Sequence, residues 1–351
     1  MSVEQSETIL GAEESAERYA AAFRIAVAAA AGFTVGHLLE WDFPFLPALI
    51  AVQLLSASRH IDLRRAFAFV LLMALGCAVS LFISLAFVDR PLNLIIIFGL
   101  IIFLEFLALA RGKGAAGVLL ITTSFVPLMA INSVDLAYAL VHNLIVGSFL
   151  ALLLIFFVAA LFPAKSVPRN DAAKVQETHP VAAAMANAAV VMSLFIYFMG
   201  TGTPASIIVI MVTALTILQQ SAIAGKDAAF GLFIGNVTGG LAATAAYALV
   251  TLLPSPAFLF LIVLLFGLLF GAKIADGGKM APIFSVGLAT FLVVLGLGLS
   301  PLPQDSSTLF VSRVFTVAVA SLYTIGIASV LRWLFLSFAR QDALGRQERV
   351  P

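Results

Sequence analysis

The chain has 351 residues, of which 62% are hydrophobic and 11% are charged, and its mean hydropathy is +1.12. A soluble domain carries about a quarter charged residues and cannot hide this much apolar surface, so soluble and disordered proteins are excluded. The formal charge of +1 points to no nucleic-acid partner, and the single cysteine, Cys77, excludes a disulfide framework and a cysteine-based metal site. We therefore predict an all-α polytopic membrane protein.

Residues 1–19 precede the first apolar stretch and are acidic. They hold five glutamates against one arginine, Arg18, which is the wrong charge for the start of a signal peptide. We predict a cytoplasmic N-terminal segment here, in which Ser15, Arg18 and Tyr19 open a short amphipathic helix that leads into the first span.

Twelve apolar stretches follow, and a helix needs about 20 such residues to cross the bilayer. They cover residues 20–39, 43–57, 66–88, 92–110, 114–131, 138–162, 181–199, 204–220, 228–250, 256–275, 279–300 and 309–334. The second and the eighth are short, so we expect these two to be tilted, broken or re-entrant. Ten spans with two buried hairpins is the alternative.

Lysine and arginine residues occupy alternate loops almost without exception. One set of loops holds nearly all of them, whereas the opposite loops hold Arg90 alone. Positive residues accumulate on the cytoplasmic side of a membrane, so both termini are predicted to be cytoplasmic. A miscounted span would scramble this pattern, which therefore supports twelve spans.

The two halves of the chain share an order of elements at an offset of about 160–170 residues. We predict membrane repeats of six helices at 20–162 and 181–336, a cytoplasmic linker at 163–180 and a cytoplasmic tail at 337–351. Because six spans is an even number, both halves enter the membrane in the same direction. This predicts parallel repeats about an axis along the membrane normal.

The short second and eighth stretches begin with prolines at matching positions: Pro44 and Pro47 in the first half, Pro204 in the second. Gln53 and Gln219 lie near their ends. Paired Pro-interrupted segments in two halves are a good pointer to a transport site, because unpaired backbone groups need protein or water around them. The alternative is that each proline merely occupies the first turn of a helix, which suits it.

Several features together resemble a known family. They are Arg24 early in the first span, the short Pro-led second span, the basic turn Arg59–Arg65 before a glycine-containing third span, and the recurrence of the six-span block. The chain resembles the fusaric-acid-resistance and aromatic-acid-exporter superfamily, in particular a short bacterial branch described as a domain of unknown function. Plant malate-type anion channels are similar distant relatives.

The resemblance implies export of organic, often aromatic, carboxylic acids across the bacterial inner membrane. It also suggests work with a periplasmic adaptor protein. The chain departs from the long exporters because it has no large cytoplasmic insertion between its halves, so any role of that insertion is in doubt here.

Cations near or inside the spans predict an anionic substrate. Arg24 and Arg313 each lie about one turn inside a span, and Arg59, Arg64 and Arg65 crowd one cytoplasmic turn. A guanidinium binds a carboxylate through two parallel hydrogen bonds. The alternatives are snorkelling of Arg24 and Arg313 to the membrane surface, and a purely topological role for the other three.

Two titratable groups are candidates for proton coupling, Glu105 and His142. Glu105 lies within the apolar run Ile101–Leu107, where an unpaired carboxylate is disfavoured and a bound proton is favoured. Its alternative is a structural ion pair with Arg24, Arg64, Arg65 or Arg111. His142 titrates near neutrality, but a hydrogen-bonded core histidine explains it equally well.

Gly231, Gly235 and Gly239 repeat at every fourth position of one stretch and predict close helix packing. No enzyme motif or cofactor signature is present, so we expect neither catalysis nor a bound cofactor or metal. The predicted function is export of organic carboxylates, driven by protons. A passive organic-anion channel is the main alternative, followed by a membrane assembly subunit. The lipid bilayer is an expected partner, and a homo-oligomer is left open.

Overall fold

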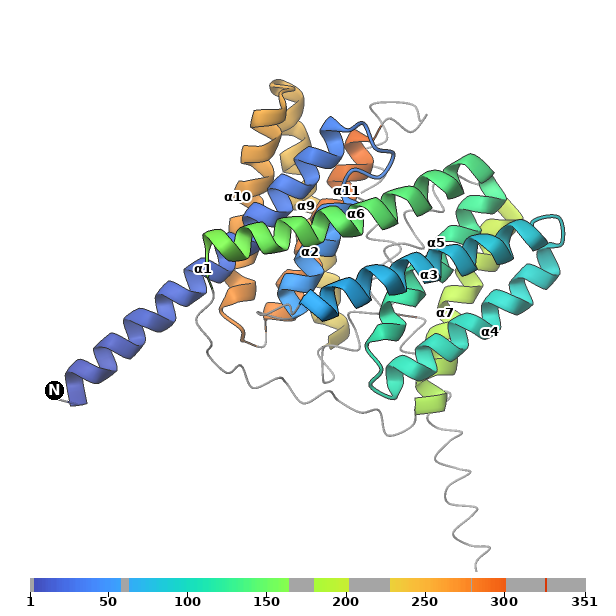
Figure 1. Ribbon diagram of the computed structural model, residues 1–351, viewed down its shortest axis with the longest axis horizontal. Helices are drawn as coiled ribbons and strands as arrows, with labels where there is room; N and C mark the ends of the chain where they lie inside the picture. The colour runs from blue at the N-terminus through green and yellow to red at the C-terminus, as the bar shows by residue number, and fades with distance from the viewer. Residues whose placement is uncertain are drawn as a thin grey trace, which may run out of the picture. The chain divides into compact units, whose positions relative to one another are not determined.

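The computed structural model describes residues 3–57, 63–163, 180–201, 228–278 and 280–300, together with residue 326. Every regular element in these ranges is a helix (Figure 1). The helices are α1 (Val3–Leu38), α2 (Leu46–Ala57), α3 (Leu63–Phe87), α4 (Pro91–Ala110), α5 (Ala115–Asn132), α6 (Val134–Leu161), α7 (Pro180–Thr201), α9 (Ala228–Leu252), α10 (Pro256–Ala275) and α11 (Ala281–Leu299).

Nine of the helices in the described ranges are long and apolar enough to cross a membrane, and only α2 is not. Their apolar spans match nine of the twelve predicted stretches with edges that differ by at most five residues. The prediction of a multi-span membrane protein is therefore confirmed. The predicted spans 204–220 and 309–334 lie outside the described residues, apart from residue 326, so the twelve-span count and the two repeats stay predictions.

Two predicted elements differ in the structure. The second predicted span contains α2, whose 12 residues extend about 18 Å and cannot cross a hydrocarbon core about 30 Å thick. Its shortness was expected, but it does not count as a full span by itself. The short amphipathic helix predicted at Ser15 is instead part of α1, which runs unbroken from Val3.

Large apolar side chains remain exposed along single faces of the long helices. On α3 they recur at almost every fourth residue: Leu63, Phe67, Leu71, Leu75, Val79 and Phe82. Leu92, Ile96, Leu100 and Leu104 form the same stripe on α4. Residues four apart share one helix face, so these stripes are continuous apolar surfaces suited to lipid tails.

The helices form two compact units, which we describe separately. Among the described residues, unit 1 contains α1, α2, α6 from Asn143, α9 from Ile234, α10 and α11. Unit 2 contains α3 from Ala68, α4, α5, the start of α6 and α7. Each unit therefore takes helices from both predicted halves of the chain.

In unit 1, small residues let α1 and α10 pack closely. A Cβ on Gly267 would lie 3.0 Å from the Cα of Ala26, and one on Gly271 would lie 3.1 Å from the backbone oxygen of Ala22. Gly267 and Gly271 are four residues apart on α10, and Ala22 and Ala26 are four residues apart on α1. Small residues at this spacing allow the backbones of membrane helices to approach, which provides the dispersion contacts that hold them together.

The predicted glycine face on α9 packs against α11. A Cβ on Gly235 would lie 2.7 Å from the backbone oxygen of Ile283, and one on Gly239 would lie 2.2 Å from that of Gly287. Close packing is therefore confirmed for these two glycines. Beside them, the Thr290 hydroxyl donates to the Asn236 side-chain oxygen, so the contact also contains a buried hydrogen bond.

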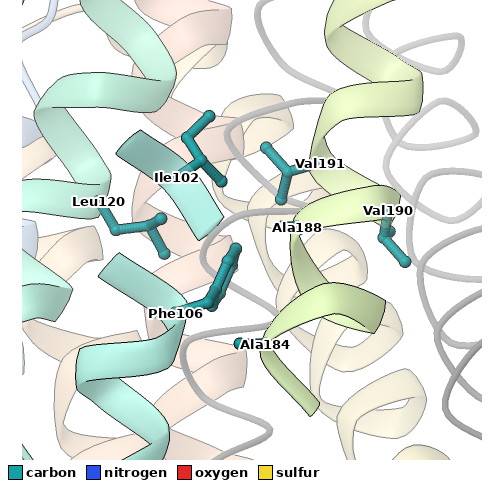
Figure 2. Packing of buried hydrophobic residues seen from close by; sticks show 7 residues of the cluster. All are labelled: Ile102, Phe106, Leu120, Ala184, Ala188, Val190 and Val191. Carbon is teal, nitrogen blue, oxygen red and sulfur yellow. The ribbon is translucent and has the colours of Figure 1, made fainter. Parts of the chain in front are cut away.

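In unit 2, α4 packs against α5 and α7. Figure 2 shows the apolar core between them, with Ile102 and Phe106 of α4 and Leu120 of α5 facing residues of α7. The α7 members are Ala184, Ala188, Val190 and Val191. This core surrounds the α4 segment that carries Glu105.

Candidate functional site

Glu105 is a buried carboxyl on α4, with 8% of its surface exposed. Its neighbours in sequence on the buried face, Ile102 and Phe106, belong to the apolar core of unit 2. The hydroxyl of Thr123 on α5 lies 2.6 Å from Glu105 Oε2. The carboxyl of Glu105, singled out because it lies in an apolar run, is thus buried, and its partner among the described residues is a neutral hydroxyl.

The charged groups around Glu105 decide between its two predicted roles. Of the described helices, α5 and α7 pack against α4; neither contains Asp, Glu, Lys, Arg or His, and Tyr197 is their one titratable residue. Within the described part of the chain, no cation forms an ion pair with Glu105. The alternative of a structural ion pair is therefore not found among these residues.

Thr123 can form a hydrogen bond with Glu105 in both protonation states of the carboxyl group. Its hydroxyl oxygen also lies 3.0 Å from the backbone oxygen of Leu119. A hydroxyl donates one hydrogen and accepts others. When the carboxyl is charged, Thr123 can donate to it; when the carboxyl is protonated, it can donate to Thr123, which then donates to Leu119.

Thr123 also lies one helical turn before a proline in α5. Pro127 is inside this helix and has no N–H, so the carbonyl of Thr123 loses its helical donor four residues later. The adjacent Ser124 side-chain oxygen is buried and has no hydrogen-bond partner among the described residues. Sequence reasoning missed these residues, although a proline three residues after the polar run 122–124 was a usable signal.

Arg24 forms a buried ion pair within α1 of unit 1. Its Nη2 donates to Glu17 Oε1 at 2.9 Å, and both side chains are 4% exposed. Sequence reasoning treated Glu17 as part of a cytoplasmic segment and did not predict the pair. Residues seven apart lie on nearly the same helix face, so the spacing could have revealed it.

The predicted residues around α2 come together within unit 1. A Cβ on Gly36 of α1 would lie 2.2 Å from the backbone oxygen of Pro44, while Gly147 of α6 packs against the Pro47 ring. The Ser300 hydroxyl, just after α11, donates to the backbone oxygen of Asp42 at 2.7 Å. The start of α2 is therefore enclosed by α1, α6 and the end of α11.

The remaining candidates are less enclosed or are not described. Gln53 is half-buried on α2, and Arg64 and Arg65 are exposed at the start of α3. His142 is exposed on α6 and has an interaction partner. Arg59, Pro204, Gln219 and Arg313 lie outside the described residues. The described residues do not gather three His, Cys, Asp or Glu side chains as a metal site requires.

Two parts of the chain match known families. Residues 188–327 match the fusaric acid resistance protein-like family, and residues 21–162 match a protein of unknown function (DUF2955). No curated protein and no solved structure matches the chain significantly. The family resemblance seen in the sequence is thereby confirmed: the chain carries a fusaric acid resistance protein-like domain in its second half and a DUF2955 domain in its first.

Proposed function

We propose that the protein is a secondary transporter of the bacterial inner membrane that exports organic carboxylate anions, aromatic acids foremost, and couples export to protons. Its many membrane spans and its fusaric acid resistance protein-like domain support transport, because that family is linked to efflux. The observation that carries the coupling is the buried carboxyl of Glu105, which has a hydroxyl partner and no described counter-cation.

The arginines support an anionic substrate. We place both termini on the cytoplasmic side of the membrane. On that side the exposed Arg64 and Arg65, with Arg59 before them, raise the concentration of anions at the entrance of the transport route. Arg24 and Arg313 are the proposed membrane cations, since guanidinium binds carboxylate with two parallel bonds. Pro44, Pro47 and Gln53, with Pro204 and Gln219 in the second half, are proposed to line the route. A periplasmic adaptor and a second copy of the chain are proposed partners.

Coupling requires that the proton on Glu105 bias one of two conformations. Protonation changes which group Thr123 donates to, from the carboxylate to the Leu119 carbonyl, one helical turn before Pro127, where α5 lacks a backbone hydrogen bond. The bias can be no larger than the difference in proton affinity between the two conformations. Helix α5, which lacks one backbone hydrogen bond at Pro127, is therefore the proposed moving element in unit 2.

The test is uptake and efflux of labelled aromatic and aliphatic acids in proteoliposomes, with and without a pH gradient. Protein-free liposomes correct for diffusion of the neutral acids through lipid. We expect accumulation against the substrate gradient when a pH gradient is applied, and downhill movement or exchange without it. Equal net flux in both conditions would identify a passive channel instead, and no flux of any acid would reject transport of carboxylates.

The role of Thr123 gives a separate prediction. Thr123→Val keeps the side-chain volume but removes the hydroxyl, and a hydrogen bond to a charged group contributes about 1.5–3 kcal/mol. We expect proton-driven accumulation to fall about tenfold or more, while Thr123→Ser, which keeps the hydroxyl, stays near the wild type. Equal losses in the two variants would mean that Thr123 acts through packing alone.

A further inference from the structure

Arg24 uses little of its hydrogen-bonding capacity. A guanidinium has five N–H donors, and this one is 96% buried, yet it makes one hydrogen bond among the described residues, to Glu17. That contact joins Nη2 to one carboxylate oxygen and is not the two-bond fork that arginine forms with carboxylates. The remaining donors of a buried cation are thus available to a second acceptor.

The described helices packed against α1 bring little charge to this ion pair. The helices packed against α1 are α2, α10 and α11, and among these only α10 contains a charged residue, Lys273. Lys273 is exposed and lies 4.0 Å from Asp276. Ala21 and Ala22, which lie between the two residues of the pair in sequence, pack against Ala275 in an apolar cluster.

We propose that Arg24 is a carboxylate-binding site and that Glu17 is its internal competitor, which occupies the site until a substrate carboxylate displaces it. This inference rests on the proposed transport of carboxylates and adds how access to the site is controlled. Exchange of one carboxylate for another leaves the charge around Arg24 unchanged, so the buried cation is never left without an anion. The incoming carboxylate binds Arg24 more strongly than Glu17 does, because it can form two parallel hydrogen bonds with the guanidinium.

The depths of the two residues make the exchange one-sided. Glu17 lies in the acidic segment before the first apolar stretch, 20–39, whereas Arg24 lies inside that stretch. Arg24 lies seven residues further along, about 10 Å deeper. A released Glu17 side chain therefore has a shorter path to water than Arg24, which lies further inside the predicted span.

Thermal unfolding of the purified full-length protein in detergent tests the competition, with benzoate as the probe. Glu17→Gln removes the competing charge and leaves a buried cation unpaired, so this variant should melt below the wild type without ligand. Benzoate should restore its melting temperature, with a half-saturating concentration about tenfold lower than for the wild type. Arg24→Gln and the double variant should show no benzoate effect.

The controls separate charge, shape and fold. Asp276→Asn removes an exposed carboxylate of the same unit and should respond to benzoate as the wild type does. Benzamide, which has no charge, and chloride, which cannot form the fork, should not stabilise Glu17→Gln. If that variant cannot be purified, Glu17→Asp keeps the charge but shortens the reach, and it should bind benzoate several-fold more tightly than the wild type.

The inference is overturned if Glu17→Gln, or Glu17→Asp in its place, has the benzoate response of the wild type, if Arg24→Gln retains that response, or if chloride or benzamide stabilises Glu17→Gln as much as benzoate. Benzoate binding is measured in detergent, where no transport takes place, so it is independent of the proposed function. Benzoate binding that depends on Arg24, combined with no carboxylate flux in proteoliposomes, would reject the proposed function and leave this site in place. Carboxylate flux without Arg24-dependent benzoate binding would reject this site and leave the proposed function in place.

Discussion

Glu105→Gln is expected to abolish the accumulation of substrate against its gradient while leaving exchange across the membrane largely intact. Glutamine has nearly the volume of a protonated glutamate and can still bond to Thr123, whose hydroxyl lies 2.6 Å from Glu105 Oε2. It cannot release a proton, so it holds the site in one state and the pH gradient no longer biases alternating access. The measurement is the accumulation ratio in proteoliposomes under a pH gradient.

The matched control is Glu40→Gln, which removes an exposed carboxyl in the turn after α1 and should accumulate substrate as the wild type does. Binding of benzoate to Glu105→Gln, followed by thermal unfolding, checks that the variant is folded. If Glu105→Gln still concentrates substrate, Glu105 is not the coupling group. His142→Gln would then be the next variant to measure, and the passive channel would gain support.

Gly36→Ala is expected to lower the stability of the protein strongly. An added Cβ at Gly36 would lie 2.2 Å from the backbone oxygen of Pro44, and a backbone atom cannot move aside as the end of a flexible side chain can. Overpacking of a well-packed interior costs about 1–3 kcal/mol and occasionally more. We expect a clear fall in the melting temperature of the purified protein, together with lower amounts of folded protein in the membrane.

Gly114→Ala is the control for this change. Gly114 precedes α5 with a φ of −58°, and no heavy atom lies within 4 Å of its added Cβ. Alanine fits such a position without strain and restricts the unfolded chain, so stability should stay the same or rise by about 0.4–1 kcal/mol. Equal melting temperatures for Gly36→Ala and the wild type would contradict the tight contact between α1 and the start of α2.

The sequence alone predicts the spans well because a membrane span is a local property. A run of apolar residues long enough for the hydrocarbon core must form a helix there, whatever its neighbours are. The nine spans in the described residues follow from this rule, as does the shortness of α2. The glycine spacing of α9 also predicted close packing, because every fourth residue faces the same neighbour.

Only the tertiary structure decided which groups meet the buried charges. Glu105 and Thr123 lie 18 residues apart on two helices, and no periodicity states that their faces meet. The same holds for the division into two units, each with helices from both halves of the chain, because contacts between distant segments depend on how helices pack. The composition of a span determines that it crosses the membrane; the shapes and small residues of its faces determine its neighbours, and those neighbours determine the surroundings of Glu105 and Arg24.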